Sequence, residues 1–96
     1  MMNDIIAPII RRAILDLLND VGGEHNDQVL AMNLNQLGHR VARRDVAEQI
    51  AWLAEKGLLI SEQLGMFIAA RINSDGRDVS DGRLVVEGVS RFRADD

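Results

Sequence analysis

Three arginines and a histidine gather where a short loop leads into a stretch of helical periodicity: His39, Arg40, Arg43 and Arg44. Arginine carries a planar fork of donors that matches phosphate and guanine in two-pronged contacts. The first turn of a helix adds a partial positive charge that also favours phosphate. We therefore expect Arg40, Arg43 and Arg44 to contact DNA, with Gln49, further along the same helix, as a candidate for base contact.

The charges around this cluster weaken the prediction. Between Arg40 and Lys56, four basic residues meet three acidic ones, and the whole chain carries a net charge of −4. Because non-specific DNA affinity comes largely from neutralising phosphates, such a protein needs a local basic patch to bind DNA. Arg44 and Glu48 are also spaced for an ordinary i,i+4 ion pair. A solvated helix face is the alternative interpretation of the cluster.

Other residues with chemical potential form no recognisable site. The chain has no cysteine, and its two histidines, His25 and His39, are too far apart to bind a metal without thiolate ligands. Asp75, Asp78 and Asp81 are spaced like the capping acids of a short solvated helix. The sequence shows neither a nucleophile motif nor a phosphate-binding glycine loop. We expect no enzyme activity, no metal and no cofactor.

The size and apolar pattern describe a small folded domain. The chain has 96 residues, of which 47% are apolar, and we expect one domain over residues 1–96. No apolar run approaches the roughly 20 residues that a membrane-spanning helix needs. The N-terminus has Asp4 where a signal peptide would carry a basic residue. A soluble cytoplasmic protein without membrane contact is the simplest expectation.

The arginine cluster needs a helix to position it, and the following residues supply one. Val46, Ile50 and Leu53 lie four and three residues apart, which predicts a helix from about Ala42 to Lys56. Gly57 is a natural end for it.

Two helices are expected before this one. The first spans about Ile5 to Asp20, with residues 1–6 as a loose arm, and the second spans about Asp27 to Leu37 after a loop at residues 24–26. Arg11 and Arg12 are expected on the outer surface of the first helix. Only residues 38–41 separate the second helix from the third, which predicts a helix-turn-helix.

Strand patterns begin after Gly57. Apolar runs at residues 58–60 and 66–72 flank a polar, glycine-ended turn at residues 61–65, which predicts a β-hairpin. Residues 73–76 end the second strand, and residues 77–82 add one or two helical turns. The tail, residues 84–96, keeps apolar side chains that dock on the domain or on another subunit. The order predicts an α+β, mostly α, winged helix-turn-helix, and the apolar excess of the first helix and the tail favours a homodimer.

Two segments in this order resemble a known family of proteins. They are residues 37–58, LGHRVARRDVAEQIAWLAEKGL, and residues 73–91, which contain NSDGRDVSDGR and VEGVSR. They are similar to small winged-helix, ArsR-like proteins of Mu-like phages and prophages. The resemblance implies a phage or prophage source, a winged-helix fold and a regulator of transcription. The resemblance does not imply metal sensing, because this chain lacks the sets of thiolate or imidazole ligands that metal-sensing ArsR repressors need.

The chain departs from the family pattern at two positions. Ala42 stands where the family has a serine that would cap the helix, and Asn73 replaces a threonine but can still act as a cap. The start of the third helix is therefore expected to be held in another way.

Two functions remain open from the sequence. The first is a dimeric phage winged-helix protein that binds double-stranded DNA through Arg40, Arg43 and Arg44. The second is a winged-helix module that binds a phage protein during assembly or DNA packaging, without touching DNA. The acidic balance, the cation-free hairpin tip at residues 61–63 and the apolar tail from Leu84 to Phe92 favour the second.

Overall fold

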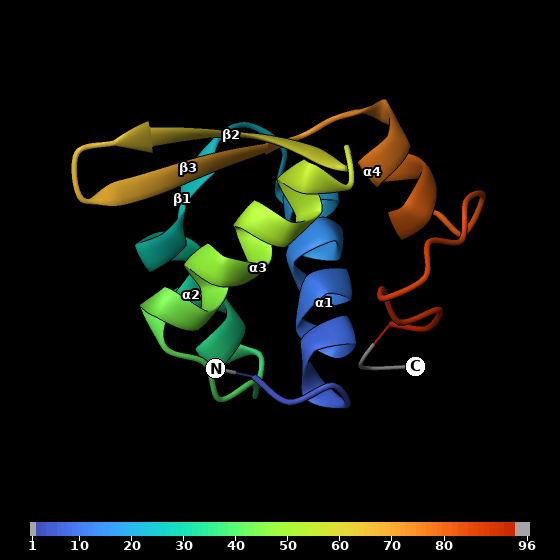
Figure 1. Cartoon of the computed structure of the whole chain (residues 1–96), viewed down its shortest axis with the longest axis horizontal. Coiled ribbons are helices and arrows are strands. Elements are labelled where there is room, and N and C mark those ends of the chain that lie inside the picture. The colour runs from blue at the N-terminus through green and yellow to red at the C-terminus, as the bar shows by residue number, and fades with distance from the viewer. Residues whose placement is uncertain (1, 94–96) are drawn as a thin grey trace.

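The protein is an α+β domain in which a three-stranded antiparallel sheet lies along one side of a group of helices (Figure 1). The computed structural model describes residues 2–93. In chain order the elements are α1 (Ile6–Val21), β1 (His25–Asn26), α2 (Asp27–Gln36), α3 (Arg43–Glu55), β2 (Leu59–Leu64), β3 (Phe67–Ile72) and α4 (Ser74–Ser80). No helix within residues 2–93 has both the length and the apolar character that crossing a bilayer requires.

The core forms where the apolar stripes of the first three helices meet under the sheet. The side chains that lose all or nearly all contact with solvent come from each of these helices: Ile10, Ile14 and Leu18 of α1, Leu30 and Leu34 of α2, and Val46, Ile50 and Leu53 of α3. Leu59, Ala70 and Ile72 close the core from the sheet side. The periodicity predicted for α3 is therefore the pattern with which this helix packs into the core.

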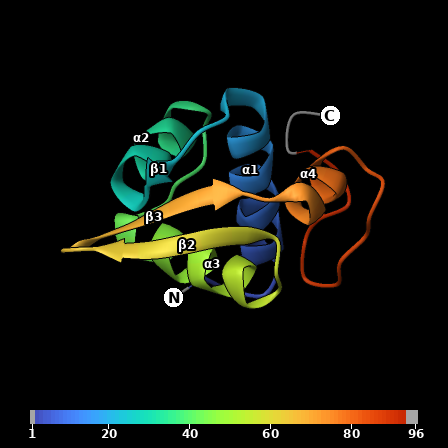
Figure 2. The same cartoon turned by 90° about the horizontal axis from the view of Figure 1, so that it is seen from above.

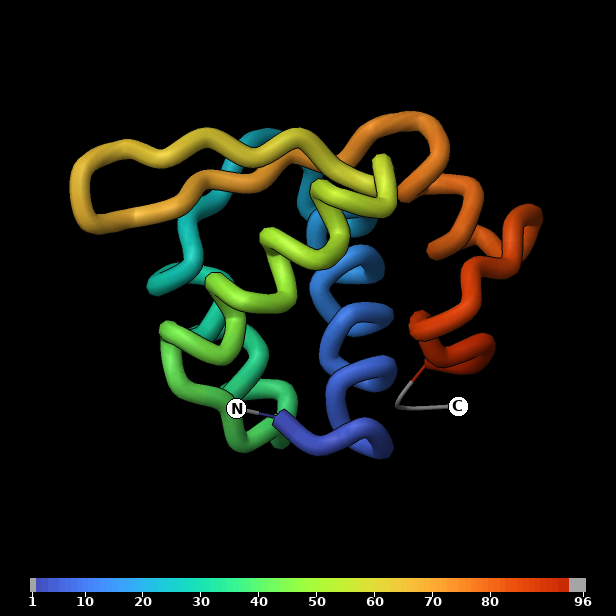
Figure 3. Tube along the Cα trace, viewed as in Figure 1, coloured from blue at the N-terminus to red at the C-terminus, as the bar shows by residue number. Residues whose placement is uncertain are grey.

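The hairpin differs from the expected one in the position of its turn. Strand β2 continues through Ser61, Glu62 and Gln63, and Leu64 pairs with Phe67, so the connection is only Gly65 and Met66. Gly65 has φ 64°, as the first position of a type II′ turn requires. The outer residues of β2 are polar because this half of the hairpin projects beyond the helices into solvent (Figure 3), not because they form a turn.

A third strand was missed in the sequence. His25 and Asn26, expected in a loop, pair with Ala70 and Ala69 of β3, so β3 is the central strand of the sheet order β1-β3-β2. Asn26 also caps α2, because its side chain accepts the Val29 N–H at 2.9 Å. Strand β1 therefore fixes the start of α2 directly against the sheet.

The N-terminal arm is shorter than residues 1–6. Helix α1 already includes Ile6, and the Asn3 side chain accepts the N–H groups of Ile5 and Ile6 at 3.0 and 2.8 Å. Met2 packs against the core. Met1, which was also assigned to the arm, lies outside the described residues.

The tail docks on its own domain. After α4 the chain runs back beside α1 as irregular structure, with Val89 buried and the Ser90 N–H donated to the Pro8 carbonyl at 3.1 Å (Figures 1 and 2). Residues 94–96, the end of the predicted tail segment, lie outside the described residues.

Candidate nucleic-acid interface

The turn between α2 and α3 is shaped by one amide side chain. Asn35 Nδ2 donates to the carbonyl oxygens of Ala31 and Val41, at 2.7 and 2.8 Å. Asn35 thereby joins the last turn of α2 to Val41, the residue before the N-cap of α3. Because of this link, the chain reverses direction within the few residues between Asn35 and Val41. Arg40 lies on this turn, so its position relative to α3 depends on Asn35, which the sequence did not single out.

The start of α3 is capped from inside the helix. Ala42 occupies the N-cap position with an extended backbone, φ −89° and ψ 159°, and has no side-chain oxygen to offer. Instead, Asp45 accepts the Ala42 N–H on Oδ2 at 3.1 Å, which is one half of a capping box. Asp45 therefore has a local structural task, and its carboxylate reduces the positive potential of the first turn.

Arg43 is largely engaged within the protein. Its Nε lies 3.5 Å from Oδ2 of Asp27, and its Nη2 donates to the Met66 carbonyl at 3.1 Å. The guanidinium also lies 5.1 Å from the centre of the Phe67 ring. Asp27 is buried, and its other oxygen accepts the Ile68 N–H at 3.3 Å. Arg43 thus ties α3 to the start of α2 and to the hairpin.

Arg40 and Arg44 are the exposed members of the cluster. Within the described part of the chain, neither takes part in a hydrogen bond or an ion pair, and both are open to solvent. The i,i+4 pair considered between Arg44 and Glu48 is not formed among these residues. Both guanidinium groups can therefore meet an external anion without first breaking an internal contact.

Gln49 has a position unsuited to base contact. Its exposed fraction is 5%, and its Oε1 accepts a hydrogen bond from Arg11 Nε at 2.8 Å. It lies on the inner side of α3 with Val46 and Ile50, because a helix turns about 100° per residue and residue 49 falls beside the apolar stripe. The structure gives Gln49 a packing role, which argues against the predicted contact with a base.

A shallow groove runs between the outer face of α3 and the hairpin. It encloses about 410 Å³ and is lined by side chains of both elements, including Arg44, Ala47 and Glu48 from α3 and Met66 and Ile68 from the hairpin. The small alanines leave the groove open, whereas Glu48 places a negative charge inside it. The tip of the hairpin presents Leu64 and Met66, which are 47% and 68% exposed, and no cation.

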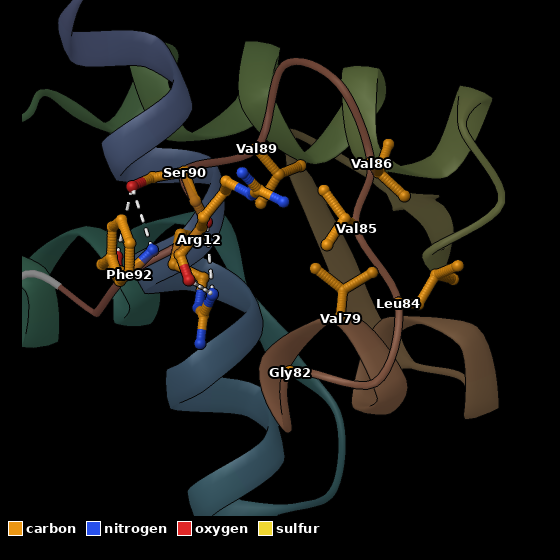
Figure 4. A pocket seen from close by; sticks show the side chains of 10 residues that line it. Arg12, Val79, Gly82, Leu84, Val85, Val86, Val89, Ser90 and Phe92 are labelled. Atoms are coloured by element: carbon orange, nitrogen blue, oxygen red, sulfur yellow. Dashed lines mark hydrogen bonds between the residues drawn. The ribbon is translucent and has the colours of Figure 1, made fainter.

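Two arginines of α1 prove to be structural, in contrast to the surface role expected for them. Arg12 is 6% exposed and forms a salt bridge with Asp16, its Nε lying 3.0 Å from Oδ1. Its other nitrogens donate to the carbonyl oxygens of Ser80, Ser90 and Arg91, at 2.9 to 3.2 Å. In Figure 4, Arg12 reaches from α1 to the tail. The spacing of Arg12 and Asp16 in the sequence is that of an i,i+4 ion pair. The backbone carbonyl partners of Arg12 could not be found from the sequence.

Arg11 holds the tail on the other side of α1. It donates from Nη1 to the Gly88 carbonyl at 2.9 Å and lies 3.9 Å from the centre of the Trp52 ring. Burial lowers the pKa of Arg11, and the nearby Asp4 carboxylate opposes that shift. Trp52 is thus covered by Arg11 and by the tail at Gly88.

The remaining candidate groups have local roles. His25 Nε2 lies 2.7 Å from the Gly22 carbonyl oxygen. Asp78 and Asp81 both pair with Arg83, at 3.5 and 3.3 Å. Within residues 2–93, no cluster of three or more histidine or acidic side chains has the arrangement of a metal site.

Comparison with known proteins identifies the family. The chain belongs to a family of phage proteins, and the phage connection expected from its motifs is confirmed. It is 42% identical over 93 residues to the uncharacterized protein gp26 of Escherichia phage Mu, covering 97% of each chain. It is also 31% identical over 61 residues to an uncharacterized protein of Haemophilus influenzae strain Rd, covering 64% of this chain and 60% of that protein. No protein-family model and no solved structure matches the chain.

Proposed function

We propose that this protein is a phage winged-helix protein that binds double-stranded DNA as a regulator of transcription. In this proposal α2 and α3 form the helix-turn-helix, α3 is the recognition helix, and the β2–β3 hairpin is the wing. The element order α1, β1, α2, α3, β2, β3 supports the assignment, as does the short connector between α2 and α3. The outer half of the hairpin projects beyond the helices, and its tip lies near the start of α3, where Arg43 donates to the Met66 carbonyl (Figure 1).

One observation carries the proposal: two exposed, unpaired arginines lie at the start of the helix that would enter the major groove. Arg40 and Arg44 lie on the turn before α3 and in its first turn, and within residues 2–93 no acid neutralises them directly. In a helix-turn-helix this end of the second helix contacts base edges and phosphates. Arg40 and Arg44 are therefore the proposed DNA-contacting residues, and Arg43 mainly holds the wing in place.

The same geometry predicts modest and salt-sensitive binding. Each phosphate neutralised by a basic side chain contributes about −0.9 to the slope of log affinity against log salt, so two arginines give a slope of about −2. Asp45 and Glu48 lie in or near the same surface and oppose phosphate. Specific recognition would then depend on guanine contacts by Arg40 or Arg44 more than on charge.

The experiment compares two double-stranded DNA titrations across a range of salt concentrations. The double variant Arg40→Ala/Arg44→Ala should lower affinity at least about tenfold and bring the salt slope close to zero. Arg77→Ala removes an exposed arginine from α4, away from α3, and should change neither quantity. An unchanged affinity and slope in the double variant would refute the proposed interface.

A second function is favoured by the hairpin tip. Leu64 and Met66 are exposed where a DNA-binding wing would place a cation, and the chain is acidic overall. These features suit a module that contacts another phage protein during assembly or DNA packaging. Absence of DNA binding even at low salt, together with binding of a phage protein that Met66→Glu abolishes, would support this alternative.

A further inference from the structure

The outer face of α3 carries a base and an acid one helical turn apart. At about 100° per residue, Arg44 and Glu48 lie within roughly 40° of each other, whereas buried Leu53 lies on the opposite side. Both charged side chains are exposed. Among residues 2–93, Glu48, like Arg44, has no hydrogen-bond or ion-pair partner. The two opposite charges therefore remain available to groups of another molecule.

The other acids of α3 differ from Glu48 in their contacts or their position. Asp45 accepts the Ala42 N–H on Oδ2 at 3.1 Å and thereby caps the helix. Glu55 lies in the last turn, about 16 Å along the helix axis from Arg44 at a rise of 1.5 Å per residue. Glu48 is thus the acid of α3 that is both without a partner and close to an arginine proposed to contact DNA.

Small side chains allow this face to approach another molecule closely. Ala47 and Ala51 flank Glu48 on the outer side of α3, and both line the groove of about 410 Å³ between α3 and the hairpin. Neither extends beyond its Cβ, so of these four side chains Arg44 and Glu48 reach furthest from the helix axis. A recognition helix in the major groove directs such side chains at the base edges.

We propose that Glu48 is a specificity-determining residue of the DNA-binding surface and selects a cytosine in the major groove. This inference rests on the proposed function, because it requires α3 to lie in that groove. An ionised carboxylate only accepts hydrogen bonds. Cytosine presents its N4 amino group there as a donor, without an acceptor of its own beside it.

The other bases are disfavoured by the same charge. Guanine presents the acceptors N7 and O6, and thymine presents O4, and each of these repels a carboxylate. Adenine offers its N6 donor, but its N7 acceptor lies next to it. Glu48 therefore discriminates largely by repelling the wrong base, at a cost in overall affinity. This accounts for an acid on a surface that otherwise attracts phosphate.

The spacing along α3 places the two base contacts close together on the DNA. Four residues of a helix rise about 6 Å, and successive base pairs rise about 3.4 Å. When Arg44 contacts a guanine, the cytosine selected by Glu48 therefore lies about one or two base pairs away. The preferred site should contain both bases at this separation.

The first experiment selects duplexes from a random-sequence library with the full native chain at low salt, and then measures affinity for duplexes that differ at one base pair. The native chain should prefer cytosine at one position of the selected site. Glu48→Gln should prefer adenine there, because an amide pairs with both N6 and N7. The ratio of affinities for the cytosine and adenine duplexes should change at least about tenfold. Glu48→Ala should bring this ratio close to one.

Glu55→Gln is the matched control. Glu55 is an exposed acid on the same face of α3, and in the part of the chain that the structure describes it also lacks a hydrogen-bond or ion-pair partner. Its replacement should leave the base preference unchanged. All of these variants change exposed side chains without such partners, so they should keep the native circular dichroism spectrum.

The second experiment detects the contact directly and uses the absence of cysteine from the chain. A Glu48→Cys variant is mixed with a selected duplex whose cytosine carries a thiol tether on N4. Oxidised glutathione accepts the two electrons that the thiols lose as they join, so a disulfide should form between protein and DNA. Glu55→Cys should form none, and a yield for Glu48→Cys no higher than this control would overturn the inference.

The outcomes separate this inference from the proposed function. Absence of duplex binding by the native chain, even at low salt, would overturn both. If the native chain binds DNA through Arg40 and Arg44 but shows no base preference, or shares its preference with Glu48→Gln, only the role of Glu48 is wrong.

Discussion

The guanidinium carbon of Arg11 lies 3.9 Å from the centre of the Trp52 ring, and the same side chain donates to the Gly88 carbonyl at 2.9 Å. One arginine thus joins α1, α3 and the C-terminal tail. Stacking on an aromatic face and a charge-assisted hydrogen bond stabilise the same contact. The tail is consequently part of the folded domain rather than an appendage to it.

A methyl group at Gly88 should break this contact. A Cβ at Gly88 would lie 2.6 Å from a Trp52 ring atom, and φ there is 96°, a conformation that favours glycine. Gly88→Ala should reduce the free energy of unfolding by about 2 to 4 kcal/mol, combining overpacking with backbone strain. Chemical denaturation measures the loss.

Gly82→Ala is the matched control. Gly82 has a similar φ of 84°, but no atom lies within 4 Å of the added Cβ. Gly82→Ala should therefore reduce the free energy of unfolding only through backbone strain, by about 1 to 2 kcal/mol. Equal losses in the two variants would mean that the Trp52 contact contributes nothing.

Arg43→Ala should loosen the hairpin. The substitution removes the partner of buried Asp27 and the donor to the Met66 carbonyl. Amide hydrogen exchange should therefore become faster at Phe67 and Ile68, which follow Met66 in β3. Leaving a buried carboxylate without its cation should also lower stability by about 1 to 3 kcal/mol.

Arg44→Ala provides the comparison for Arg43, since Arg44 lies next in sequence and forms no hydrogen bond or ion pair within residues 2–93. It should leave both exchange and stability close to native. If both substitutions changed exchange equally, the assignment of Arg43 as the residue that positions the hairpin would be wrong.

Ala42→Ser should stabilise the protein. The Ala42 backbone already has the extended conformation of an N-cap, and a serine oxygen could accept the Asp45 N–H. The expected gain is about 0.5 to 1 kcal/mol, measured by thermal unfolding. Ala42→Gly offers no side-chain oxygen, so a gain of the same size there would exclude capping as the cause.

The sequence pattern predicted α3 well, because the apolar stripe of this helix is the surface that it buries. Val46, Ile50 and Leu53 point into the core as expected, and α3 differs from its predicted bounds by only one residue at each end. The hairpin turn was misplaced because the polar residues 61–63 were interpreted as a turn. Polar residues also occur in a strand that is exposed to solvent, as these are in β2. Strand β1 has only two residues, which is too short for any alternation to show.

The candidate site was predictable in part. Proximity in sequence placed Arg40, Arg43 and Arg44 together, but it could not show that Arg43 is engaged with Asp27 and Met66. Gln49 was chosen for its amide, whereas that amide is buried and accepts a hydrogen bond from Arg11, which lies 38 residues earlier in the chain. Sequence spacing can suggest which residues share a helix, but it does not reveal which of them have partners from other elements.

The hydrogen bonds of Arg12 have a consequence for how the protein is made. Its carbonyl acceptors at Ser80, Ser90 and Arg91 lie 68, 78 and 79 residues further along the chain. Contacts of such long range close the largest loops, and their entropy cost makes them slow to form. During synthesis from the N-terminus, Arg12 acquires these partners only after the chain has been made as far as Arg91. Folding of this domain is therefore completed only after Ser90 and Arg91 have left the ribosome.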